Sequence, residues 1–320
     1  MEKATLDELK SAQEIVYRHL KPTPEITWPL LSARCGVEVW VKHENHTPIG
    51  AFKVRGGLTY LDYLSREQPD VKGIISATRG NHGQSLAFAA ARYGISATIL
   101  IPFGNNPEKN NAMRALGADL IEHGEDFQEA REHAEVLGQE KKLHMIGPFH
   151  PRLLQGVGTY ALEFLTACPE LDVVYVPIGQ GSGICGMISA RDALGLNTKI
   201  VGVVAENAAS YALSFDQKKA VSTNSADTMA DGLACRIPDE NALAIILAGA
   251  EDVISVSEDE IMAAMRYYFI DTHNLAEGAA AAPLAGLLKE KDQRAGNKIG
   301  LVLSGGNVDK ITFKNVMNGD

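Results

Sequence analysis

Cysteine is scarce in this sequence of 320 residues, and its four positions, Cys35, Cys168, Cys185 and Cys235, include no Cys-x-x-Cys pair. This wide spacing argues against a disulfide framework or a zinc site and favours a reducing cytoplasm. Long apolar runs are also lacking, since the alanine-rich segment around Ala279 is too short to span a membrane. The first residues contain no basic segment followed by an apolar run, so we expect no signal peptide.

Basic side chains are in the minority, because 30 lysines and arginines face 40 aspartates and glutamates, for a net charge of −10. This balance argues against nucleic acid or an anionic membrane as the main partner, although a small anion can still bind locally. Hydrophobic residues make up 45% of the chain, enough for the core of one large or two moderate domains. We therefore expect a soluble globular protein.

Short apolar segments typical of strands alternate with segments of helical periodicity along most of the chain. This alternation predicts an α/β fold with two parallel or mostly parallel open sheets and helices on both faces. Residues 207–250 mix helix-like and loop-like segments. The strands are expected at residues 37–42, 73–77, 97–102, 119–121, 143–146, 173–178, 199–205, 252–256 and 298–303.

Glycine-containing turns follow three of these strands, at residues 78–83, 179–186 and 304–307. A fourth turn after a strand carries Lys53, which lies between an aromatic and a β-branched residue. Ligands of parallel sheets bind beyond the carboxyl ends of the strands. We infer that the four turns converge on one crevice.

Lys53 itself has two interpretations. A lysine held in a dry pocket has a lowered pKa and can act as an amine nucleophile toward a carbonyl group. A lysine at a helix start can instead bury only its apolar stem and keep its amino group in water. The Lys53 segment alone favours neither interpretation.

The turn from Gly179 to Gly186 follows a strand and opens a helix, an arrangement that suits a bound phosphate. Its part from Gly181 to Gly186 also matches the G-x-G-x-x-G dinucleotide pattern, with Glu206 at the end of the next strand. An NAD-dependent oxidoreductase is therefore an alternative, and a purely structural turn is another. A dinucleotide leaves Lys53 and the other turns unexplained, whereas pyridoxal phosphate has a phosphate for this turn and an aldehyde for Lys53.

With these residues in view, the chain resembles the fold-type II pyridoxal-phosphate enzymes, with a tryptophan synthase β-like fold, and within them the serine/threonine dehydratase and serine racemase family. The resemblance extends from Pro22 to Asn307 and rests on several motifs in the family's order. These motifs are Gly50-Ala51-Phe52-Lys53-x-Arg55-Gly56, Gly80-Asn81-His82-Gly83-Gln84, the Gly179 turn, Ala230-Asp231-Gly232 and Ser304-Gly305-Gly306-Asn307.

The resemblance implies a role for each motif. Lys53 would form the Schiff base with pyridoxal 5'-phosphate and remove the α-proton of the substrate. The other cofactor-binding residues would be Phe52, Asn81, Gly179, Gln180, Gly181, Ser182, Gly183, Glu277 and Ser304. The substrate-binding residues would be Thr78, Arg79, Gly80, Asn81, His82 and Gly232.

The implied activity is β-elimination from a 3-hydroxy-α-amino acid such as threonine, serine, 3-hydroxyaspartate or phenylserine, which yields a 2-oxo acid and ammonia. A β-replacement synthase on the same fold and a cofactor-binding protein without catalysis remain alternatives. We expect a catabolic, cytoplasmic homodimer without a regulatory domain. We expect a larger cofactor-binding domain at residues 1–50 and 149–320, and a smaller, mobile substrate-loop domain at residues 51–148.

Two positions depart from the family's pattern. Arg79 stands where the racemases carry a serine, and because arginine is a poor general acid we expect little racemase activity. Its guanidinium suggests a second anionic group on the substrate, although Arg79 could also face solvent or pair with Glu44. Glu206 matches the first ligand of the divalent-cation site of some relatives, but Ala212 occupies the second, so we expect no metal. His82 is expected to be structural.

Overall fold

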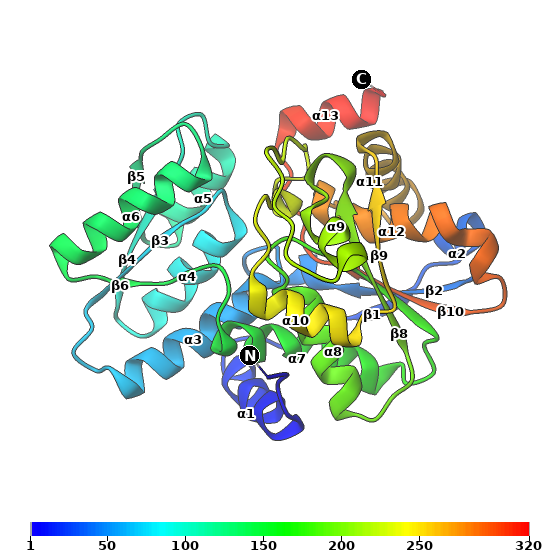
Figure 1. Cartoon of the computed structure of the whole chain (residues 1–320), viewed down its shortest axis with the longest axis horizontal. Coiled ribbons are helices and arrows are strands. Elements are labelled where there is room, and N and C mark those ends of the chain that lie inside the picture. The colour runs from blue at the N-terminus through cyan, green and yellow to red at the C-terminus, as the bar shows by residue number, and fades with distance from the viewer. Residues whose placement is uncertain (1, 320) are drawn as a thin grey trace.

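The computed structural model describes residues 2–319 and contains two separate sheets, each flanked by helices (Figure 1). The larger sheet has six strands, and all neighbouring strands in it are parallel except the first pair, β1 and β2. The predicted α/β fold class is therefore confirmed. In spatial order the strands are β1 (Glu25–Thr27), β2 (Glu38–His43), β10 (Lys298–Leu303), β7 (Val173–Pro177), β8 (Lys199–Ala205) and β9 (Asp252–Val256).

The smaller sheet has four strands and is parallel throughout. In spatial order these are β5 (Ala118–Glu122), β4 (Ser96–Ile101), β3 (Gly73–Ala77) and β6 (His144–Met145). Figure 1 shows this sheet and its helices on one side of the larger sheet. Its helices are α3 (Lys53–Glu67), α4 (Asn81–Arg92), α5 (Pro107–Ala115) and α6 (Phe127–Lys141).

Helices cover both faces of the larger sheet, and this explains why the sequence of β7 is apolar throughout. Val174 and Val176 pack into the core that includes α7 and α8, whereas Val173 and Tyr175 pack into the core that includes α11 and α12. Alternate side chains of a strand point to opposite faces, so a strand buried on both faces needs consecutive apolar residues. The helices around this sheet are α1 (Leu6–Tyr17), α2 (Pro29–Cys35), α7 (Pro151–Ala167), α8 (Ser182–Ala193), α9 (Ser210–Gln217), α10 (Glu240–Gly249), α11 (Glu258–Thr272), α12 (Gly278–Glu290) and α13 (Lys310–Asn318).

The helix that carries Lys53 begins at that residue, because Ala51 forms a β-bridge with Gly305 and the Phe52 amide donates to the Ser304 carbonyl, 2.9 Å. The Lys53 turn is thereby attached to the end of β10. The irregular region 207–250 holds α9, the short 3-10 helix η3 (Asp231–Leu233) and α10. The other 3-10 helices are η1 (Glu44–His46), η2 (Glu206–Ala208) and η4 (Lys291–Arg294).

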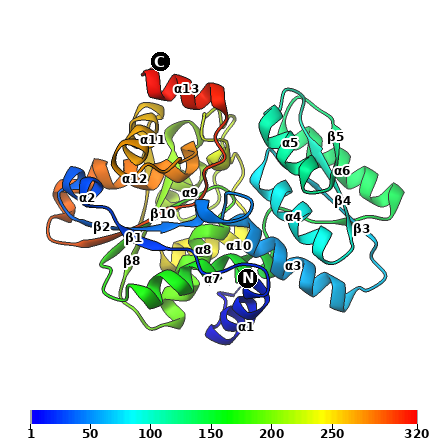
Figure 2. The same cartoon turned by 180° about the vertical axis from the view of Figure 1, so that it is seen from behind.

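A buried ionic network anchors the start of α3. Arg55 is fully buried and donates to Glu44, which follows β2, at 2.7 Å and to Glu163 of α7 at 2.6 Å. It also donates to the hydroxyl of Thr159 at 3.0 Å, while buried Lys42 of β2 donates to Glu163 at 2.6 Å. Figure 2 shows α3 and α7 close together beneath the sheet, where this network joins them.

Replacing Arg55 with methionine tests how far the fold depends on this network. The variant Arg55→Met leaves the carboxylates of Glu44 and Glu163 buried without the guanidinium, so we expect the free energy of unfolding to fall by about 3–5 kcal/mol in urea titrations. Arg131→Met is the matched control, because Arg131 pairs with Glu135 on the surface and its loss should cost less than about 0.5 kcal/mol. Equal effects of the two substitutions would contradict a stabilising role for the network.

Candidate active site

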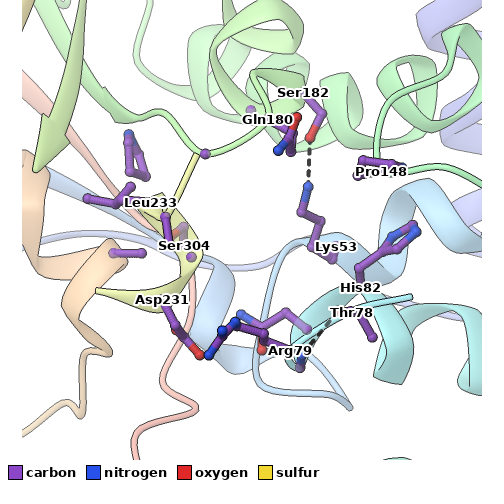
Figure 3. A pocket seen from close by; sticks show the side chains of 18 of the residues that line it. Lys53, Thr78, Arg79, His82, Pro148, Gln180, Ser182, Asp231, Leu233 and Ser304 are labelled. Carbon is purple, nitrogen blue, oxygen red and sulfur yellow. Dashed lines mark hydrogen bonds between the residues drawn. The ribbon is translucent and has the colours of Figure 1, made fainter. Parts of the chain in front are cut away.

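One cavity is lined by residues that follow strands of both sheets (Figure 3). The Lys53 turn, the loop after β3, the turn after β7 and the segment after β10 all contribute to its wall. Every site residue expected from the sequence lies in this wall: Phe52, Lys53, Thr78, Arg79, Gly80, Asn81, His82, Gly179, Gln180, Gly181, Ser182, Gly183, Gly232, Glu277 and Ser304.

Lys53 is the first residue of α3, and its amino group lies inside the cavity. Its Nζ donates to the Ser182 hydroxyl at 3.0 Å and lies 5.0 Å from the centre of the Phe52 ring. Burial lowers the pKa of Lys53 to about 8. The backbone is held as well, because the Ser85 hydroxyl donates to the Lys53 carbonyl at 2.5 Å. Lys53 is thus a positioned amine with weakened basicity.

The turn from Gly179 to Gly183 leads directly into the first turn of α8. Gly181 has a φ of +92°, a conformation that favours glycine, and a side chain at Gly179 would meet the Gly232 carbonyl. Tyr160 donates its hydroxyl to the Gly183 carbonyl at 3.0 Å and so fixes the end of the turn. Backbone N–H groups at a helix N-terminus favour an anion, so this turn suits a phosphate.

Asn81 and Glu277 meet in the wall of the same cavity. Asn81 Nδ2 donates to Glu277 Oε1 at 2.7 Å, and Asn307 Nδ2 donates to Asn81 Oδ1 at 2.8 Å. The other oxygen, Glu277 Oε2, is buried and has no hydrogen-bond partner within residues 2–319. Burial raises the pKa of Glu277 to about 7, with Lys109 opposing the rise and Asp231 adding to it.

His82 is buried in the first turn of α4. Burial, and then the nearby charge of Lys53, lower the pKa of His82 to about 3, so the ring is neutral near pH 7. Its Nε2 atom has no hydrogen-bond partner in the described part of the chain. A ring that is neutral near pH 7 has no imidazolium proton to give, which favours the expected structural role.

Lys109 and Asp231 also line the cavity; Asp231 belongs to the expected Ala230-Asp231-Gly232 motif, whereas Lys109 was not expected from the sequence. Lys109 of α5 forms an ion pair with Asp231 of η3, so it links a helix of the smaller sheet to the larger-sheet side. Its stem packs beside Gly80, where a Cβ would lie 2.8 Å from the lysine Cδ. A lysine on a polar helix gives no sequence signal for such a position. The other unexpected lining residues are Ala77, Phe127, Pro148, Pro177, Leu233, Ala234 and Ala279.

A family model described as pyridoxal-phosphate dependent enzyme matches residues 16–305. The chain belongs to this family.

Relatives of this pyridoxal-phosphate dependent enzyme include proteins named as ammonia-lyases. The chain is 32% identical over 315 residues to L-threonine ammonia-lyase of Thermotoga maritima, covering 98% of this chain and 78% of that protein. It is 31% identical to L-threo-3-hydroxyaspartate ammonia-lyase of Saccharomyces cerevisiae, and the match covers 98% of this chain and 97% of that protein. The solved structure of processed threonine deaminase isoform 2 from Solanum lycopersicum matches with a TM-score of 0.90 and 31% identity. This match covers 99% of this chain and 94% of that chain.

The residues of the cavity fit pyridoxal phosphate. The glycine turn is shaped for a phosphate, Lys53 offers an amine, and Glu277 Oε2 is a buried acceptor that still lacks a partner in the described residues. These relatives support neither an NAD-dependent oxidoreductase nor a β-replacement synthase. Glu206, the acid of the dinucleotide pattern, instead lies 3.5 Å from Lys289.

Within residues 2–319, no helix combines the length and the apolar composition that a membrane span requires. No group of three or more histidine, cysteine, aspartate or glutamate side chains in the same range is placed to hold a metal ion.

The raised pKa of Glu277 predicts a pH dependence of stability in the cofactor-free protein. Between the ordinary value of 4.5 and about 7, folded Glu277 keeps a proton that the unfolded chain has lost. The free energy of unfolding contributed by this group therefore falls as the pH rises through that range. Urea titrations between about pH 5 and pH 8 should show wild type losing stability relative to Glu277→Gln. A difference between the two proteins that stays constant with pH would contradict the assignment.

Proposed function

We propose that this enzyme catalyses the β-elimination of a 3-hydroxy-α-amino acid, such as threonine, serine, 3-hydroxyaspartate or phenylserine, to a 2-oxo acid and ammonia. The observation that carries the proposal is the position of the Lys53 amino group, 3.0 Å from the Ser182 hydroxyl in the phosphate-type turn and in the same cavity as Asn81 and Glu277. The names of the relatives point to the same reaction class.

In this proposal Lys53 acts as the general base. When bound, pyridoxal phosphate supplies an electron sink for the electron pair of the broken Cα–H bond. Lys53 takes the α-proton on Nζ, and its lowered pKa leaves part of the amine neutral near pH 7 to 8. The fixed backbone of Lys53 limits the positions that its amine can reach, which selects one face of the substrate.

Other residues orient the reactants. The turn from Gly179 to Gly183 would hold the phosphate of the cofactor with its backbone N–H groups. The loop from Thr78 to His82 leads into the N-terminus of α4 and suits the α-carboxylate of the substrate. Ser304, buried after β10, would offer a neutral hydroxyl to the ring nitrogen of the cofactor, and a neutral group would not force ring protonation. That choice favours elimination over transamination.

Four further assignments belong to the same proposal. Residues 51–148 form a smaller substrate-loop domain, and residues 1–50 and 149–320 form the cofactor-binding domain; the division follows the two sheets. The enzyme works in the cytoplasm, which agrees with four buried cysteines that form no disulfide. It forms a homodimer, in which exposed apolar side chains such as Phe269, Ile270 and Leu275 would find cover. Racemase activity is low because Arg79 is a poor general acid.

The role of Lys53 is tested by spectroscopy and turnover of the purified enzyme. The wild-type enzyme should absorb at roughly 410–420 nm, as a lysine Schiff base of the cofactor does. It should also form a 2-oxo acid from at least one of the four substrates. Lys53→Ala should lack the band and lose about 1000-fold or more in kcat. Lys72→Ala, outside the cavity, is the matched control. A wild-type protein without the band, or an active Lys53→Ala variant, would overturn the proposal.

A further inference from the structure

Arg79 lies at the junction of two cavities. It follows β3 in the loop that precedes α4, and its exposed side chain lines both the cavity of Lys53 and an adjoining outer cavity (Figure 3). Its neighbour in sequence is Gly80, in the loop proposed to hold the substrate's α-carboxylate. A group attached to the next carbon of the substrate therefore comes within reach of this side chain.

Arg79 has no counter-charge in the part of the chain that the structure describes. No hydrogen bond or ion pair joins it to another residue in the range 2–319, so the pairing with Glu44 considered from the sequence is wrong, and Glu44 pairs with Arg55 instead. Asp231 lines both cavities together with Arg79, but its carboxylate is held by Lys109.

The other arginines of the outer cavity are already paired. Arg131 lies 3.1 Å from Glu135, and Arg236 lies 3.8 Å from Asp126. The remaining outer wall is rich in acids, which would repel a long anionic substrate tail. These acids are Asp227, Asp239 and Glu240. A substrate with a short anionic side chain, whose charge lies beside Arg79, is therefore favoured over a substrate with a longer anionic side chain.

We propose that Arg79 binds a second anionic group of the substrate, a carboxylate on its β-carbon, and so makes 3-hydroxyaspartate the preferred substrate. The planar guanidinium can donate two parallel hydrogen bonds to a carboxylate, which a lysine at this position could not do. This inference rests on the proposed function and assigns its specificity to a single side chain.

The reaction balances without an oxidant or reductant. The Cα–H and Cβ–OH bonds of 3-hydroxyaspartate break and one water leaves. The released enamino acid tautomerises to the imino acid, takes up one water and loses ammonia, which leaves oxaloacetate. The net change is 3-hydroxyaspartate to oxaloacetate and ammonia, and both carboxylates are unchanged.

A rival substrate is suggested by the apolar part of the cavity wall. Phe127, Pro148 and Leu233 could pack against the ring of a β-aryl substrate such as phenylserine. That substrate has no charge for Arg79 and would leave the guanidinium unpaired in the complex. The two substrates are therefore separated by their response to substitution of Arg79.

The test compares the wild-type holoenzyme with Arg79→Gln and Arg79→Lys, using 3-hydroxyaspartate, serine, threonine and phenylserine. We expect wild type to have its highest kcat/KM with 3-hydroxyaspartate, and Arg79→Gln to lower the ratio of kcat/KM for 3-hydroxyaspartate over serine by about 30-fold or more, mainly through KM. Arg79→Lys should lie between them. Arg131→Gln, which removes a paired arginine of the outer cavity, should leave the ratio within about twofold.

A binding measurement separates this inference from the proposed function. Aspartate has both carboxylates but no β-hydroxyl, and alanine has only the α-carboxylate, so the Kd of each is measured from the change in cofactor absorbance. Arg79→Gln should weaken aspartate binding about 10- to 100-fold relative to alanine binding. An unchanged aspartate-to-alanine ratio of Kd, or a wild-type preference for phenylserine or threonine, would overturn the inference. Failure of all four substrates to react would overturn the proposed function, and the Kd ratio would still decide the role of Arg79.

Discussion

The buried ion pairs of Arg55 constrain the rest of the active site. Lys53 and Arg55 lie two residues apart in the first turn of α3, so their side chains point to different sides of that helix. Arg55 is held by Glu44 and Glu163, and its direction fixes the rotation of α3 about its axis. Lys53 must then face the cavity. A buried guanidinium without those two carboxylates would be costly, so the helix has one favourable orientation.

A second set of contacts joins the segments that carry the site. The Phe52 amide bonds to the Ser304 carbonyl, and Asn307 Nδ2 donates both to the Ile49 carbonyl and to Asn81 Oδ1, each at 2.8 Å. One asparagine therefore connects the end of β10, the Lys53 turn and the loop before α4. Because these contacts bridge the two sheets, a displacement of the smaller sheet would alter the surroundings of Asn81.

The sequence was sufficient for the parts of the site that depend on local chemistry. Two kinds of local pattern could be interpreted without knowing which residues they contact in the fold. These are the glycines that follow apolar strands and the lysine that lies between apolar residues. The edge strand β1 was not predicted because it has only three residues, and its pairing with β2 depends on the whole sheet. The start of α3 could not be fixed from the local pattern either, because it depends on contacts of Ala51 and Phe52 with the segment after β10.

Lys109 shows most clearly what could not be predicted. In the sequence Lys109 belongs to a polar helix beside the smaller sheet. Its partner Asp231 lies 122 positions further along the chain, on the side of the larger sheet. Only the packing of the two sheets brings them together. Their ion pair also affects two other charged residues of the cavity. The Asp231 carboxylate is already paired and so does not pair with Arg79, and the Lys109 charge partly offsets the rise in the pKa of Glu277. The charges of this cavity wall therefore depend on one contact between the two sheets, because the Lys109–Asp231 pair leaves the Arg79 guanidinium without an ion-pair partner among residues 2–319.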